Sequence, residues 1–206
     1  KDNKEVEAIF RSAISNADGK STTRASGTLW DSGDAIGVFA LNQSETPGVY
    51  SVYNEKENIK YINNTSGSIA HFQAEGETIT FPGSNEELDF IAYYPYTSTG
   101  ITVGSDMEPA LTMQIDISQQ SPLSGIDVMY ARATGNNSEN PTVELTFNHS
   151  LSQLTLELTS DENISLEGTV ITIHNAFTQG SMNLYDGTVT LAETVSGEVI
   201  TPVTVY

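Results

Sequence analysis

The stretch Ile36-Gly37-Val38-Phe39-Ala40-Leu41 is a continuous apolar run in a chain of 206 residues. A short, uninterrupted run of this kind is typical of a β-strand that is buried on both faces. A second dense apolar run, Asp89-Phe90-Ile91-Ala92-Tyr93-Tyr94, ends at Pro95. Together the two runs predict the central strands of a β-protein.

Shorter strand patterns lie around these runs, and Gly, Pro, Asn and Asp signals separate them about every 8–12 residues. They cover residues 50–53, 59–62, 69–74, 78–81, 111–117, 127–131, 143–151, 170–174, 181–185 and 188–191. Much of the polar composition is Thr, which suits a pleated surface, and Asn and Gly, which suit turns. The spacing predicts an all-β sandwich or barrel rather than an α/β fold.

The chain is strongly acidic, with 27 Asp and Glu against 8 Lys and Arg and a formal net charge of -19. This charge repels a phosphate backbone, so nucleic acid is excluded as a partner and docking to anionic lipid is disfavoured. Spread over a β-protein, it also favours solubility over edge-to-edge association. The absence of cysteine excludes disulfides and thiolate chemistry. No apolar run approaches the ~20 residues of a transmembrane helix, and the start of the sequence shows no signal-peptide pattern.

Residues 135–141 are polar and turn-forming, and they mark the expected domain boundary. We predict an N-terminal strand and linker at residues 1–26, a first sandwich at residues 27–141 and a partial second sandwich at residues 142–206. Apolar side chains after the boundary alternate on odd numbers up to Leu151 and on even numbers from Leu154. Because a one-residue shift moves side chains to the other face, we expect a β-bulge or bend near Ser152.

Residues 5–14 have an apolar pattern that fits two structures. The strand face would be Val6, Ala8, Phe10, Ser12 and Ile14. The helical stripe would be Val6, Ile9, Phe10, Ala13 and Ile14. Periodicity does not separate the two for so short a run. As a strand the segment would span roughly 33 Å, enough to complete a sheet.

Behind this segment lies a polar linker with Arg24, one of three arginines, followed by Ala25. A trypsin-like protease that cuts the Arg24–Ala25 bond would separate residues 5–14 from everything downstream. In a protein built from strands, such a cut would act as an assembly switch.

No catalytic, cofactor or metal motif is found, and we expect no enzyme activity and no cofactor. The three histidines are far apart, and His149 is expected to be a hydrogen-bonded core residue. Residues 30–34 lack the ligand series of a calcium loop and predict a turn, with Asp34 bonding backbone. Glycosidase carboxylates have no fixed spacing, so a hydrolase stays a distant alternative. Tyr93, Tyr94 and Tyr96 are a candidate sugar-stacking platform, with strand packing as the competing interpretation.

Several stretches, taken in order, resemble the fimbrillin family of Bacteroidales, the type V pilins. They are Thr23-Arg24-Ala25, WDSGDAIGVF at 30–39, ITFP at 79–82, DFIAYYPY at 89–96, DVMYA at 127–131, LTFNHSLSQL at 145–154 and GSMNL at 180–184. The resemblance implies two transthyretin-like β-sandwich domains in tandem, of which the second has fewer strands in this chain than the family pattern. The stretch from Lys1 to Glu5 is similar to the charged segment that follows the lipidated cysteine of surface lipoproteins.

The resemblance also implies a function. In the family, a trypsin-like protease removes the first strand at a linker arginine, and a strand from the next pilin subunit, usually C-terminal, fills the groove. Here the removable strand would contain Val6, Ala8, Phe10, Ser12 and Ile14, and the processed bond would be Arg24–Ala25. We therefore expect an adhesive outer-membrane fimbria subunit, exported as a lipoprotein precursor whose lipid anchor lies upstream of Lys1. The alternative is a non-polymerising surface lipoprotein of the same fold that binds a host or bacterial glycan or protein.

Overall fold

The computed structural model describes residues 5–15, 28–43, 50–83, 86–104, 111–120, 122–154, 156, 158–160, 165–192 and 197–202. Its strands are β1 Val6–Glu7, β2 Ile9–Ile14, β3 Ala35–Gln43, β4 Tyr50–Val52, β5 Ile59–Asn63, β6 Ile69–Ala74, β7 Thr80–Phe81, β8 Leu88–Tyr94, β9 Ile101–Val103, β10 Leu111–Asp116, β11 Met129–Asn136, β12 Thr142–His149, β13 Val170–Ala176, β14 Gln179–Asn183, β15 Val189–Leu191 and β16 Gly197–Pro202. Two short 3-10 turns, η1 Tyr53–Glu55 and η2 Leu123–Gly125, connect them. The prediction of an all-β chain is confirmed.

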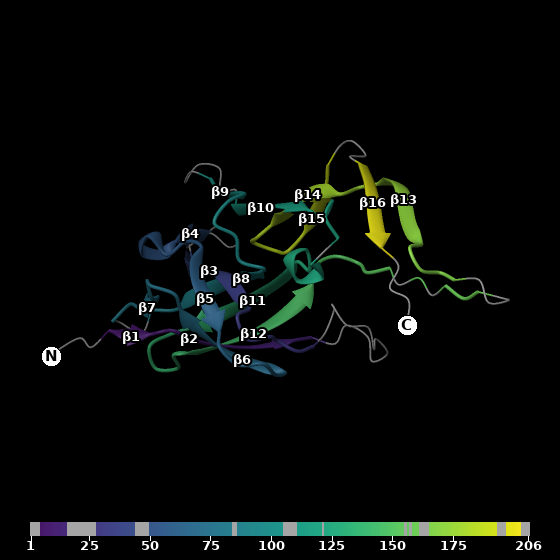
Figure 1. Cartoon of the computed structure of the whole chain (residues 1–206). Helices are drawn as coiled ribbons and strands as arrows, with labels where there is room; N and C mark the ends of the chain where they lie inside the picture. The colour runs from purple at the N-terminus through teal and green to yellow at the C-terminus, as the bar shows by residue number, and fades with distance from the viewer. Residues whose placement is uncertain are drawn as a thin grey trace.

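Seven strands form a ring in which each strand pairs with the next. The order is β3-β5-β6-β2-β12-β11-β8, and β8 pairs again with β3. All of these pairs are antiparallel except β2 with β12, which run parallel. The N-terminal strand β2 lies between β6 and β12 (Figure 1). Residues 5–14 therefore form two strands, at 6–7 and 9–14 with a break at Ala8, and not the alternative helix.

β3 and β8 are buried on both faces, as their apolar runs predict. Their inward side chains join the core inside the ring. Their outward side chains, Phe39, Leu41, Ile91 and Tyr93, pack against a second sheet of order β15-β14-β10-β9. Leu111, Met113 and Met182 of that sheet are buried in the contact. The molecule thus has one core inside the ring and another between the ring and the second sheet.

The turn at residues 30–34 leads into β3 as expected. Gly33 has a φ of +98°, a left-handed conformation that favours glycine. The Asp34 carboxylate accepts a hydrogen bond from the Asp31 N–H at 2.7 Å and another from the Tyr94 hydroxyl at 3.0 Å. Asp34 therefore closes the turn and fastens it to β8, which is turn chemistry and not calcium coordination.

The boundary predicted before Thr142 does not separate two sheets. β12, which starts at Thr142, is itself a strand of the ring and pairs with β2 and β11. The expected bend is present, at Leu151, but the expected continuation of the strand beyond Ser152 is not found among the described residues. β12 ends at His149, and no strand occurs among the described residues between 150 and 160. Leu154, Leu156 and Leu158 are exposed there, Leu154 at 66%. β13 and β16 pair with each other and stand apart from the ring (Figure 1).

Candidate functional site

The candidate site is the seat of β2 between β6 and β12. On one side Phe10 lies opposite Phe72 and Ser12 opposite Ala70, both on β6. On the other side β12 runs parallel to β2 from the Thr142–Ile9 pair to the Phe147–Ile14 pair. Main-chain bonds extend this seat at both ends. The Ala8 N–H donates to the Ile79 carbonyl at 2.9 Å, and the Ser15 N–H donates to the Phe147 carbonyl at 2.8 Å.

The inward side chains of this segment enter the core of the ring. Ala8, Phe10, Ser12 and Ile14 are buried, and Val6 packs against the same core with partial exposure. The Phe10 ring is fully buried and meets Tyr61 and Phe90 edge-on, at centroid distances of 4.7 and 5.2 Å. Burying a large apolar side chain contributes roughly 1.5–3 kcal/mol, so Phe10 is a main anchor of the strand.

The outer face of β2 contributes little to its attachment. Ile9 is 52% exposed. Arg11 pairs with Glu144 of β12 at 3.0 Å, but both side chains are largely open to solvent. Exposed ion pairs typically contribute well under ~1 kcal/mol, so the strand is held by its inward face and its main chain.

The walls of the seat are aromatic, which the sequence did not predict. The single tryptophan, Trp30, is fully buried and meets Phe72 of β6 and Phe147 of β12 edge-on, each at 5.2 Å. Burial raises the pKa of Tyr61 to about 12, and its hydroxyl accepts the Ile79 N–H at 3.0 Å. These residues come from distant parts of the sequence, so only the strand order identifies them as neighbours of β2.

The predicted processing bond, Arg24–Ala25, lies outside the described residues. The sequence places it between β2 and Trp30, so a cut there would leave β2 attached to the ring by non-covalent contacts alone.

The tyrosine platform is not formed as the sequence interpretation required. Tyr93 is fully buried, and its hydroxyl donates to Asn58 Oδ1 at 2.6 Å. Tyr94 is also buried, and its hydroxyl donates to Asp34. Burial raises the pKa of both phenols, which stay neutral. Only Tyr96 is partly exposed, and Lys60 Nζ lies 5.3 Å from its ring centroid. The rings of Tyr93 and Tyr94 therefore offer no stacking surface for a sugar.

Comparison with known proteins now identifies the family. Residues 23–205 match the family described as fimbrillin-like. The chain belongs to the fimbrillin-like family. A curated relative from Bacteroides uniformis, "Putative fimbrium subunit Fim1C", is 33% identical over an alignment of 171 residues, and the match covers 80% of this chain and 52% of the relative. This fimbrillin-like chain thus spans about half the length of that relative.

Solved structures share the fold of this fimbrillin-like chain. One is described as a "putative cell adhesion protein" from Bacteroides uniformis. It is 26% identical with a TM-score of 0.68, over 97% of this chain and 70% of that one. Another of the same description, from Bacteroides ovatus, is 21% identical with a TM-score of 0.69, over 98% and 74% of the two chains. The second likeness shows the fold alone.

Neither a metal centre nor a membrane-spanning helix occurs in the part of the chain that the structure describes. Among the residues that the structure describes, no group of three or more His, Asp or Glu side chains is arranged to hold a metal ion. Within the same described ranges, no helix is long and apolar enough to cross a membrane.

Arg132, which forms an ion pair with the buried Asp89 on the neighbouring strand of the ring, also links the ring to the second sheet. Asp89 of β8 is 1% exposed on its side chain, and Arg132 of β11 donates to it at 3.0 Å. The same guanidinium lies over the Tyr50 ring, 4.6 Å from its centroid, and donates to the Tyr185 carbonyl at 3.2 Å. Tyr185 follows β14 of the second sheet, so Arg132 fastens that sheet to the ring.

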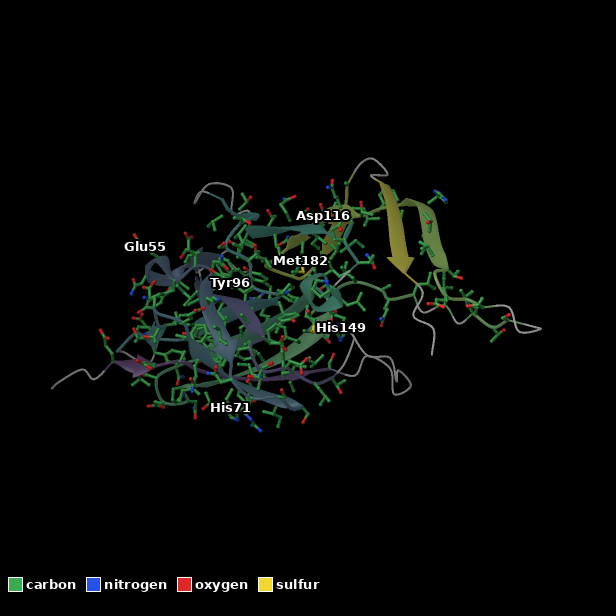
Figure 2. All side chains as sticks on the ribbon, viewed as in Figure 1. Glu55, His71, Tyr96, Asp116, His149 and Met182 are labelled. Atoms are coloured by element: carbon green, nitrogen blue, oxygen red, sulfur yellow. The ribbon has the colours of Figure 1, made fainter. Side chains whose placement is uncertain are left out.

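His149 is hydrogen-bonded, as predicted, but it is partly exposed and not the core residue that the sequence indicated. Its Nδ1 lies 2.7 Å from Asp127 Oδ1, and its side chain stands at the end of β12 (Figure 2). The hydrogen bond to Asp127 raises the pKa of His149 above its ordinary value, and the charge of Asp127 adds to the effect, while burial opposes it.

We expect an NMR titration to find the pKa of His149 above about 6.5 and to find it lowered by Asp127→Asn. A histidine pKa raised by folding stabilises the native state fully below the unfolded pKa of about 6.5. That contribution disappears as the pH rises through the folded pKa. Asp127→Asn should therefore destabilise the protein more at pH 5.5 than at pH 8.5 in urea unfolding. An equal loss at the two pH values would contradict this account.

Proposed function

We propose that this chain is a structural, non-enzymatic subunit of a cell-surface fimbria, with a role in adhesion, that assembles by strand exchange. In this proposal a trypsin-like protease cuts Arg24–Ala25, β2 leaves its seat, and a strand from another pilin subunit replaces it. Export as a lipoprotein to the outer membrane, with the lipid anchor upstream of Lys1, belongs to the same proposal. The family membership and the fimbrial name of the relative from Bacteroides uniformis support it.

The main support for the proposal is that β2 is one of the strands that make up the ring, between β6 and β12. Removing β2 would leave β6 and β12 with unpaired N–H and C=O groups facing one another across a groove. Unpaired backbone groups in a buried groove are costly. A strand supplied by another chain satisfies them, which is the β-augmentation mode of peptide recognition.

Cleavage changes the energetics of β2 without changing its contacts. While the linker is intact, β2 binds its seat in an intramolecular step, with an effective concentration on the order of millimolar or higher. After the cut the strand is a short, separate peptide, and the fraction of it that stays bound depends on its concentration. A second subunit presented at high local concentration can then displace it.

We propose that the chain contains two sandwich units, but that the boundary between them is not the one expected between residues 141 and 142. The strand Thr142–His149 is part of the ring, and β14 and β15 belong to the sheet that packs against the ring, so of the described strands after His149 only β13 and β16 are left for the second unit. The exposed Leu154, Leu156 and Leu158 and the separate pair of β13 and β16 support such a unit. The glycan-binding alternative has no comparable support, because Tyr93 and Tyr94 are buried.

The test is peptide exchange after cleavage. The chain is cut briefly with trypsin, sequencing confirms a new N-terminus at Ala25, and the protease is inhibited. A fluorescent peptide of residues 5–15 is then added. We expect the cut chain to bind the peptide and the uncut chain not to bind it. A variant with Lys20→Gln and Arg24→Gln, which keeps the linker whole, should behave as uncut. A cut chain that takes up no peptide would overturn the proposal.

A further inference from the structure

The inward face of β2 contains one residue that does not match its surroundings. Ala8, Phe10 and Ile14 are apolar, but Ser12 between them carries a hydroxyl and is 1% exposed. Its Oγ has no hydrogen-bond partner in the described part of the chain. A buried hydroxyl without a partner loses the bonds that it makes with water and gains none in return, so it opposes burial.

The neighbours of Ser12 are apolar on both sides. It lies opposite Ala70 on β6 and opposite Leu145 on β12, and both side chains are buried in the core of the ring. Trp30, which packs across Phe72 and Phe147 on the same two strands, also leaves its Nε1 without a partner among the described residues. The side chains around Ser12 can therefore pack against an apolar group, but they provide no hydrogen-bond partner for its hydroxyl.

We infer that Ser12 weakens the resident strand in favour of an incoming strand that is apolar at this position. This inference rests on the proposed strand exchange and names the chemistry of the partner. The partner is an extended segment of another chain with a side chain such as Ala or Val opposite Ala70 and Leu145. It gains the same main-chain pairing as β2 and carries no buried hydroxyl, so exchange proceeds toward the replacement.

The test compares peptides of residues 5–15 that enter the cut, protease-inhibited chain. We expect Ser12→Ala to tighten binding about tenfold over the natural peptide, which corresponds to about 1.4 kcal/mol. Ser15→Ala is the matched control, because the Ser15 hydroxyl is bonded to Asn148 Oδ1. Its removal should leave binding unchanged or weaken it.

A second measurement uses the intact chain and does not depend on exchange. Ser12→Ala should raise the Tm of the uncut chain by about 2–4 °C. If the natural peptide enters but Ser12→Ala binds no tighter, the inference is overturned while the proposed function stands. A Ser12→Ala chain with an unchanged or lower Tm would also overturn it. If no peptide enters the cut chain, strand exchange itself fails, and the inference fails with it.

Discussion

Phe10→Ala is expected to lower the free energy of unfolding by about 3–5 kcal/mol, the usual loss when a buried phenylalanine is truncated. The Phe10 ring is fully buried and meets Tyr61 and Phe90 edge-on, so its removal leaves a cavity among rings that cannot close it easily. Urea unfolding followed by the fluorescence of Trp30 measures the loss, because Trp30 is the single tryptophan and lies in the same core.

The matched control is Ile9→Ala on the adjacent position of β2. Ile9 is 52% exposed, so its truncation should change the free energy of unfolding by no more than about 0.5 kcal/mol. If the two variants lost similar amounts, the assignment of the inward and outward faces of β2 would be contradicted.

Arg132→Met is expected to destabilise the protein by about 3 kcal/mol, since it leaves the Asp89 carboxylate buried without its cation. The Asp89 side chain is 1% exposed, whereas Arg132 retains 27%, which keeps the expected loss at the lower end of the range for buried pairs. The Gly135 N–H also donates to Asp89, at 3.1 Å, and this bond should remain in the variant and compensate in part. Equilibrium unfolding in urea measures this loss.

Arg11→Met is the control for this pair. The Arg11–Glu144 and Arg132–Asp89 pairs have the same 3.0 Å separation and differ in burial. Because water screens the exposed pair, Arg11→Met should cost less than about 1 kcal/mol. Equal losses in the two variants would show that burial does not decide the strength of these pairs. The double variant with Asp89→Asn and Arg132→Met should recover part of the loss, since no charge is then buried.

The sequence predicted those strands whose burial can be recognised from an uninterrupted run of apolar residues. The runs at residues 36–41 and 89–94 have few polar side chains, and they form β3 and β8, buried on both faces. The turn at residues 30–34 was also predictable, because Gly and Asp occupy the positions that its backbone requires. Residues 5–14 were ambiguous, since five positions fit each period and Val6, Phe10 and Ile14 fit both. Pairing with β6 and β12, which are far away in the sequence, decides that they form strands.

Long-range pairing also explains what the sequence interpretation missed. The polar stretch at residues 135–141 indicated a domain boundary, yet β12 returns to the ring beside β2. The tyrosines at 93 and 94 looked suited to a surface, but the second sheet and the ring core cover them. Leu154, Leu156 and Leu158 alternate like a strand although their described surroundings contain no partner strand. For β12 and the two tyrosines, the deciding neighbours lie far away along the chain.

In the proposed exchange β2 must leave its seat before another strand can enter, and a disulfide that locks β2 in place tests this requirement. Arg11 and His71 are direct partners across the antiparallel pair of β2 and β6, and the exposed His71 lies on the outer face of β6 (Figure 2). Paired positions of this kind lie about 4.5–5.5 Å apart at Cα, within the span of a disulfide. The chain has no cysteine of its own, so Arg11→Cys with His71→Cys gives a single, reversible bond.

We predict that the oxidised double variant, cut after Arg24, keeps β2 and does not bind the peptide of residues 5–15. Reduction of the disulfide should restore peptide uptake to the rate of the Arg11→Cys variant alone. Equal uptake before and after reduction would contradict the claim that the seat of β2 is the site of exchange.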